Sequence, residues 1–183
     1  MKKKLVLGAA MAVAACIVLA WGAAPILTAQ ALIKAAKARD VARIEQLVDF
    51  PALRASMKDE LNAELITRMR RDPRIQDNNL GGLAMMLAPS LLEGAVDTVV
   101  TPQGVAMMVT TAEAPDPTRP DPPEPDDARD SSDIHQAWGY RSLNAFAVTL
   151  TDRDQPDQRL ALILERRGLF AWKLAAVDLT LAD

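Results

Sequence analysis

The sequence has very few of the side chains that usually carry metal-ion or covalent chemistry. Cys16 is the single cysteine and His135 the single histidine among 183 residues. One cysteine cannot form an internal disulfide, and a zinc site needs several cysteine or histidine ligands. We therefore expect no metal ion and no cofactor, and we expect burial of apolar side chains to supply the stability of the fold.

Aromatic and basic side chains are also too scarce for a nucleic-acid-binding protein. Phe, Trp and Tyr make up 4% of the chain, and 21 basic residues face 24 acidic ones, for a net charge of −3. Beyond the N-terminal lysines, a basic cluster without interleaved aromatics consists of Arg68, Arg70, Arg71 and Arg74. A nucleic-acid interface needs a positive surface and stacking groups, so we predict no nucleic-acid partner.

No motif for a known reaction is present. His135 follows Ser131, Ser132 and Asp133, but a proline-rich segment is a poor frame for a catalytic triad. Four aspartates could serve an acid–base enzyme if the fold gathered them in one cavity: Asp40, Asp49, Asp97 and Asp178. The simplest interpretation of Asp40 and Asp49 is that they cap helices.

The strongest signal in the chain is its N-terminal segment. Lys2 to Lys4 precede residues 5–24, which contain no charged side chain, and Pro25 follows. Twenty helical residues span roughly 30 Å, the thickness of the hydrocarbon core of a bilayer. Trp21, near the end of this run, suits a membrane interface. We therefore predict that residues 5–24 contact a lipid bilayer and that residues 1–25 form a membrane anchor.

Two kinds of processing are alternatives to a retained anchor. A signal peptidase could cut after Ala31, because residues 29–31 have a small-x-small pattern. Residues 13–16 loosely fit a lipoprotein site at which Cys16 would be lipidated, although the apolar run continues beyond it. A retained single-pass anchor fits the length of the run best.

The short basic N-terminal tail, Lys2 to Lys4, indicates how the protein is oriented in the membrane. Such a tail normally stays in the cytoplasm, although basic residues after the anchor nearly balance it. We expect a bacterial inner-membrane protein with its C-terminal domain in the periplasm.

Residues 26–112 have the spacing of helices. Asp40 is predicted to cap a helix that ends near Val48, and Pro51 to open the next one. That helix carries an apolar side chain at every fourth position: Leu53, Met57, Leu61, Leu65 and Met69. This stripe indicates one buried face. A further helix restarts at Thr101-Pro102.

The remaining chain divides into a linker and a sheet. Residues 113–136 are rich in proline and acidic residues and are predicted to be a disordered linker. Residues 137–183 show apolar alternation in three runs, separated by turns at residues 152–157 and at Arg167-Gly168. The prediction is an α+β fold in which a three-stranded antiparallel meander packs on the helices of residues 26–112. Phe170, Trp172 and Leu174 would share the buried face of the last strand.

Several motifs give the chain a resemblance to a known family. They are residues 38–40, residues 48–54, Val100-Thr101-Pro102-Gln103-Gly104, Tyr140-Arg141-Ser142-Leu143-Asn144 and residues 168–174. In this order they resemble a family of bacterial membrane-anchored proteins that is known only as a domain of unknown function. The resemblance implies an N-terminal anchor, helices and a terminal meander, and it implies no activity or site residue.

Two classes of function remain, a non-enzymatic module and an enzyme. The favoured one is a non-enzymatic binding or scaffold module at the inner membrane, which binds a partner protein or an apolar ligand. The alternatives are an enzyme that uses the scattered carboxylates in a cavity and a carrier of lipid or another apolar ligand.

Overall fold

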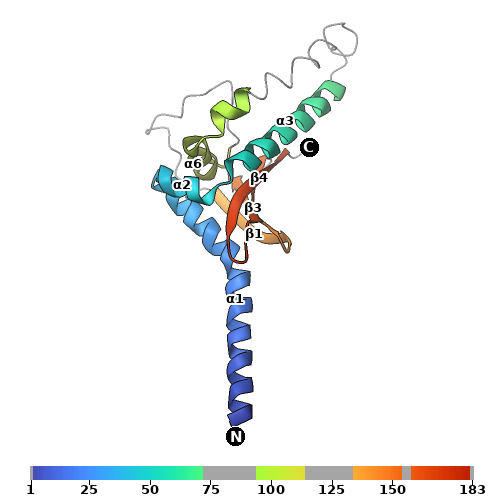
Figure 1. Ribbon diagram of the computed structural model, residues 1–183. Coiled ribbons are helices and arrows are strands. Elements are labelled where there is room, and N and C mark those ends of the chain that lie inside the picture. The colour runs from blue at the N-terminus through green and yellow to red at the C-terminus, as the bar shows by residue number, and fades with distance from the viewer. Residues whose placement is uncertain (1, 72–93, 114–133, 154–157, 182–183) are drawn as a thin grey trace.

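The computed structural model describes the chain except for residues 1, 72–93, 114–133, 154–157 and 182–183. Helices come first and an antiparallel sheet comes last, so the predicted α+β class is confirmed (Figure 1). Most of the predicted linker lies outside the described residues. The sheet begins at Ile134, so the last three residues assigned to the linker belong to the first strand.

Helix α1 (Lys2–Lys37) runs without interruption through Pro25, where the sequence led us to expect a boundary. Proline has no N–H to donate to the Trp21 carbonyl, and its ring crowds that carbonyl. The helix accordingly changes direction where it meets the other helices (Figure 1), as expected of a proline kink. It continues because the next turns are held by packing, with Ala29 and Leu32 fully buried.

The two halves of α1 have different surroundings. Between Met11 and Ala20, every side chain that the structure describes is exposed, and most of them are apolar. From Ala24 onwards one face of the helix is buried in the core, through Ala24, Ala29, Leu32, Ala35 and Ala36. Among the described helices, α1 over Met11–Lys37 is the one that is long and apolar enough to cross a membrane.

Two capped helices follow. Asp40 accepts a hydrogen bond from the N–H of Arg43 at the start of α2 (Val41–Leu47), as predicted. Asp49 accepts one from the N–H of Ala52 in the first turn of α3 (Phe50–Arg71). Leu53 and Met57, the first members of the predicted stripe, are fully buried, and Leu61 is partly buried.

A sharp reversal connects helical residues 94–99 to α6 (Pro102–Thr111). Thr101 caps α6 by accepting a hydrogen bond of 3.1 Å from the N–H of Gly104. A β-carbon on Gly104 would overlap the carbonyl oxygen of Val99, so the reversal requires glycine there. The predicted restart of a helix at Thr101-Pro102 is confirmed.

The sheet has four strands in sequential order, rather than the three that were predicted. They are β1 (Ile134–Ser142), β2 (Ala145–Asp152), β3 (Gln158–Arg166) and β4 (Trp172–Leu181). Residues 137–150, which were expected to be one strand, form a hairpin that turns at Leu143-Asn144. The hydroxyl of Ser142 accepts a hydrogen bond from the N–H of Asn144 and so stabilises this turn.

The second hairpin turn is longer than the predicted Arg167-Gly168 turn. Arg167 donates its N–H to the carbonyl of Ala171, so residues 167–171 form the turn. Trp172 and Leu174 are buried as predicted, but Phe170 lies in the turn and is half-exposed, so its predicted place in the core is wrong. The longer turn removes Phe170 from the alternation of the strand.

One face of the sheet packs on the helices and forms the main core. Alternate residues of β2 and β3 supply it, and the N-terminal part of α3 runs beside β4. Asp49 donates its N–H to the carbonyl of Leu174 at 2.8 Å, which ties the start of α3 to β4. The opposite face carries a smaller cluster of buried residues, Ala147, Ala161 and Ile163.

Candidate functional site

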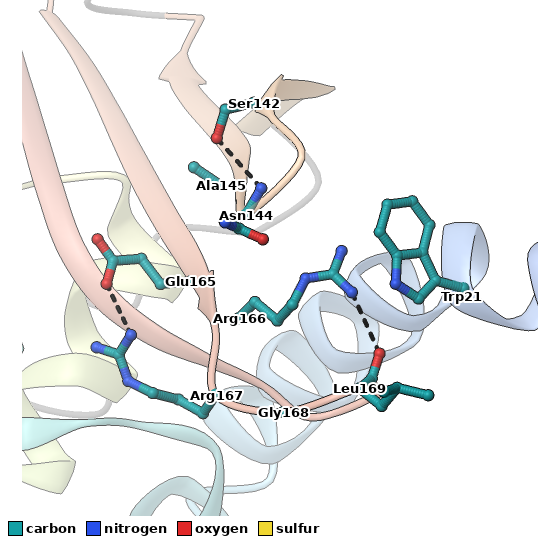
Figure 2. Close-up of a pocket in the computed structure, with 9 residues that line it drawn as sticks. All are labelled: Trp21, Ser142, Asn144, Ala145, Glu165, Arg166, Arg167, Gly168 and Leu169. Atoms are coloured by element: carbon teal, nitrogen blue, oxygen red, sulfur yellow. Dashed lines mark hydrogen bonds and ion pairs between the residues drawn. The ribbon is translucent and has the colours of Figure 1, made fainter.

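A cavity of about 590 Å³ lies where α1 enters the domain, at the turns of both hairpins (Figure 2). Residues from α1 and from the two hairpins line it: Trp21, Ser142, Asn144, Ala145, Glu165, Arg166, Arg167, Gly168 and Leu169. The exposed half of α1 begins at its edge. The site therefore joins the predicted anchor to the sheet.

Arg166, the last residue of β3, is the centre of this junction. Its guanidinium carbon lies 4.0 Å from the ring centroid of Trp21 and 4.6 Å from that of Trp172. The same guanidinium donates hydrogen bonds to the carbonyl oxygens of Leu143 at 2.7 Å and Leu169 at 3.2 Å. One side chain thus links both hairpin turns to α1, and Figure 2 shows it reaching between them.

Tyr140 makes a second link between the sheet and α1. Its hydroxyl donates a hydrogen bond of 2.7 Å to the carbonyl oxygen of Gly22. Its ring meets the rings of Phe146 and Trp172 edge to face, with centroids 5.1 Å and 6.2 Å away. Since Trp21 and Gly22 are consecutive, two side chains of the sheet hold one turn of α1.

Arg167 turns away from α1 and pairs with two carboxylates. Its Nε lies 2.7 Å from Oδ2 of Asp49, and its Nη1 lies 2.8 Å from Oε2 of Glu165. The hydrogen bond from Arg167 holds the pKa of Asp49 below its ordinary value, and the Asp49 carboxylate in turn raises the pKa of Arg167. This pair fastens the β3–β4 turn to the start of α3.

The cavity lining suits a ligand with an apolar part and a polar part. Trp21 and Leu169 supply apolar surface, and Ser142 and Asn144 supply a hydroxyl and an amide. Arg167 pairs with two carboxylates, whereas Arg166 donates hydrogen bonds to neutral carbonyl oxygens, which do not cancel its positive charge. The Nε of Arg166 is buried and has no hydrogen-bond partner among the described residues. No cluster of three or more metal-ligating side chains occurs in the part of the chain that the structure describes.

The four aspartates that the sequence offered for acid–base chemistry do not line this cavity. Asp40 and Asp49 cap α2 and α3, as predicted. They therefore already serve as acceptors for backbone N–H groups.

The other two aspartates lie on different elements and have different partners. Asp97 is half-exposed. Its Oδ1 lies 3.6 Å from Nε of Arg54 and 3.4 Å from Nζ of Lys58. Asp178 pairs with Arg141 at 2.7 Å across the face of the sheet that the helices leave uncovered. Each aspartate thus has partners of its own, and the four do not converge on one site.

The remaining sequence candidates are also separated. His135 is an exposed residue of β1, and its neighbours Ser131, Ser132 and Asp133 lie outside the described residues. Cys16 is exposed on α1. Sequence reasoning noted Trp21 but missed Arg166, because no local pattern pairs a strand-end arginine with a distant tryptophan.

A comparison with protein families shows a match over residues 13–108 to the family described as "Protein of unknown function (DUF2939)". No curated protein and no solved structure matches the chain. The matched segment includes the motifs of the helical region up to Gly104, whereas those of the two hairpin turns lie beyond it. Because the match covers more than half of the sequence, this chain belongs to the DUF2939 family of proteins of unknown function.

Proposed function

We propose that the protein is a single-pass, membrane-anchored binding or scaffold module without enzymatic activity. In this proposal residues 5–24 cross a bacterial inner membrane and the remaining chain lies in the periplasm. The observation that carries it is the division of α1 into an exposed apolar half and a half packed in the domain core. Exposure of these apolar side chains to water is unfavourable, whereas their contact with the hydrocarbon core of a bilayer is favourable.

The links to α1 support the role of a scaffold. A flexible linker would let the domain move freely above a bilayer, but here the helix continues from its exposed half into the core. Arg166 and Tyr140 hold the turn at Trp21 and Gly22. The domain therefore has a defined distance and direction from the surface, as a module that presents a site to a membrane-bound partner requires.

A carrier of lipid or another apolar ligand is the second candidate. The cavity beside Trp21 favours it, because that cavity would open at the interfacial layer of the proposed bilayer. Its mixed lining resembles the chemistry of a molecule with an acyl chain and a polar head.

An enzyme that uses the scattered carboxylates has less support. Acid–base catalysis needs titratable groups that converge on one substrate site. Asp40, Asp49, Asp97 and Asp178 each have a separate structural partner.

Fractionation of cells that express the full chain tests the anchor. We expect the protein to stay in the membrane fraction after alkaline carbonate washing and its C-terminal domain to be cut by protease added to spheroplasts. Release by carbonate would contradict the anchor, and protection from protease would contradict the periplasmic orientation.

Native mass spectrometry of the protein extracted from its own membranes tests ligand binding. Ala145→Leu adds three carbon atoms to the cavity lining and narrows the cavity, and Ala137→Leu, at an exposed position of β1, is the matched control. A carrier predicts an adduct that the first variant loses and the second keeps. A chain without an adduct would favour the scaffold over the carrier.

A further inference from the structure

Three large apolar side chains are exposed at the two hairpin turns that border the cavity. Leu143 in the β1–β2 turn is 72% exposed, and Leu169 and Phe170 in the β3–β4 turn are 70% and 46% exposed. Hairpin turns of soluble proteins usually carry polar residues. Apolar residues at the tips of both turns therefore need an explanation.

The tips of the two hairpins, at Leu143 and Leu169, lie close to Trp21. Arg166 stacks on Trp21 and donates hydrogen bonds to the carbonyls of Leu143 and Leu169, so one side chain fixes all three residues together. Figure 1 shows the β3–β4 turn beside α1 at the point where the helix leaves the domain. The apolar surface of the tips thus adjoins the exposed apolar surface of α1.

We propose that Leu143, Leu169 and Phe170 form a membrane-contacting rim that inserts into the interfacial layer of the bilayer that α1 crosses. This inference rests on the proposed anchor and extends it from a single helix to a second, separate contact. If residues 5–24 span the hydrocarbon core, Trp21 lies at its border, where tryptophan is favoured. The rim would then lie at the depth at which amphipathic elements bury their apolar side chains.

The rim has chemistry suited to an interface rather than to the hydrocarbon core. Polar groups line the cavity that the tips border, including Ser142, Asn144 and the guanidinium of Arg166. An arrangement of apolar tips backed by polar groups matches the change from acyl chains to headgroups across the interfacial layer. Two contacts, the helix and the rim, would fix the tilt of the domain as well as its distance from the membrane.

Site-directed fluorescence quenching in lipid vesicles tests the rim. Cys16 is the single cysteine, so Cys16→Ala gives a background without a reactive thiol. Single cysteines are then introduced in the full chain by Leu143→Cys and Leu169→Cys, which report on the two hairpins independently. The labelled protein is reconstituted in vesicles of phosphatidylcholine and phosphatidylglycerol, with and without nitroxide-labelled acyl chains.

Two control positions make the result interpretable. Leu19→Cys places the label on the exposed half of α1 and tests the anchor itself. Val41→Cys places it on an exposed apolar residue of α2, at the end of α1 away from the exposed half. We expect nitroxide lipids to quench labels at positions 19, 143 and 169 several-fold more than the label at position 41.

Each other result would overturn a distinct statement. If position 19 is quenched but positions 143 and 169 behave like position 41, the tips lie in water, free for a protein partner. The rim is then wrong while the anchor stands. If position 19 is not quenched, the anchor is wrong, and the rim fails with it. Equal quenching at position 41 would also overturn the rim, because the contact would not be specific to the hairpin tips.

Discussion

Gly104 has no space for a β-carbon, since the carbonyl oxygen of Val99 occupies the place where it would lie. Gly104→Ala should therefore lower the free energy of unfolding by about 1–3 kcal/mol, although alanine is the better helix former. Gly94→Ala is the control, because a β-carbon there meets no atom within 4 Å. Thermal unfolding in detergent measures both, and a Gly104→Ala protein as stable as the control would contradict the close approach.

Asp49 combines a helix cap with a charge pair, and two substitutions separate these roles. Asp49→Asn keeps a good capping group and loses the pair with Arg167, so we expect a loss of up to about 1 kcal/mol. Asp49→Ala loses both and should cost about 1–2 kcal/mol. Equal stability of the two variants would show that the cap contributes nothing.

The pH dependence gives a separate prediction for Asp49. Arg167 holds the pKa of folded Asp49 below its ordinary value of 3.8. The pair therefore stabilises the protein above that ordinary value, and its contribution is lost as the pH falls through the lowered pKa. Unfolding of the wild type and Asp49→Asn should differ at neutral pH and converge in strong acid. A constant difference would contradict the charge pair.

At the scale of elements, Arg166 joins α1 to both hairpins. Arg166→Lys keeps the charge but loses the planar fork that reaches two carbonyls and stacks between Trp21 and Trp172. We expect a loss of about 1–3 kcal/mol in the free energy of unfolding.

Arg159→Lys is the matched control, because Arg159 is exposed on the same strand. Arg159→Lys should change the free energy of unfolding by no more than about 0.5 kcal/mol. Denaturant unfolding followed by tryptophan fluorescence distinguishes the two variants. If Arg166→Lys were no less stable than Arg159→Lys, Arg166 would not hold the junction together.

The same elements show what local sequence can and cannot predict. The cap at Asp40, the helix restart at Thr101-Pro102 and the stripe from Leu53 to Leu61 were predicted correctly, because capping, proline at a helix start and periodicity are local signals. The β1–β2 turn was missed because Leu143-Asn144 is a weaker turn signal than a glycine pair. Continuation of α1 through Pro25 depends on packing against the rest of the fold, which no local pattern encodes.

The candidate site was predictable only in part, for the same reason. Trp21 was noted in the sequence as a residue suited to a membrane interface, and the structure places it in the lining of the candidate site. Its partners Tyr140 and Arg166 lie far along the chain and meet it only after the sheet has formed. The motif at residues 140–144 was noted as part of a family resemblance, and the structure now gives Tyr140 a physical role in it.

At the scale of the whole molecule, the protein consists of three successive regions along the axis of α1. The exposed apolar half comes first, the junction at Trp21 and the hairpin turns second, and the helices packed on one face of the sheet third (Figure 1). This order follows from the distribution of apolar residues, which surround the first half of α1 and face one side of it afterwards.

The proposed membrane span can be tested most directly at Cys16, the only cysteine, which is exposed on α1. A water-soluble maleimide is added to intact membranes, and a second sample is treated after solubilisation in dodecyl sulfate. A charged, water-soluble maleimide does not enter hydrocarbon, so a thiol in the bilayer core stays unlabelled. The proposal predicts no labelling in membranes and full labelling after solubilisation. Labelling in intact membranes would contradict the span, and no labelling after solubilisation would show that Cys16 is lipidated or removed.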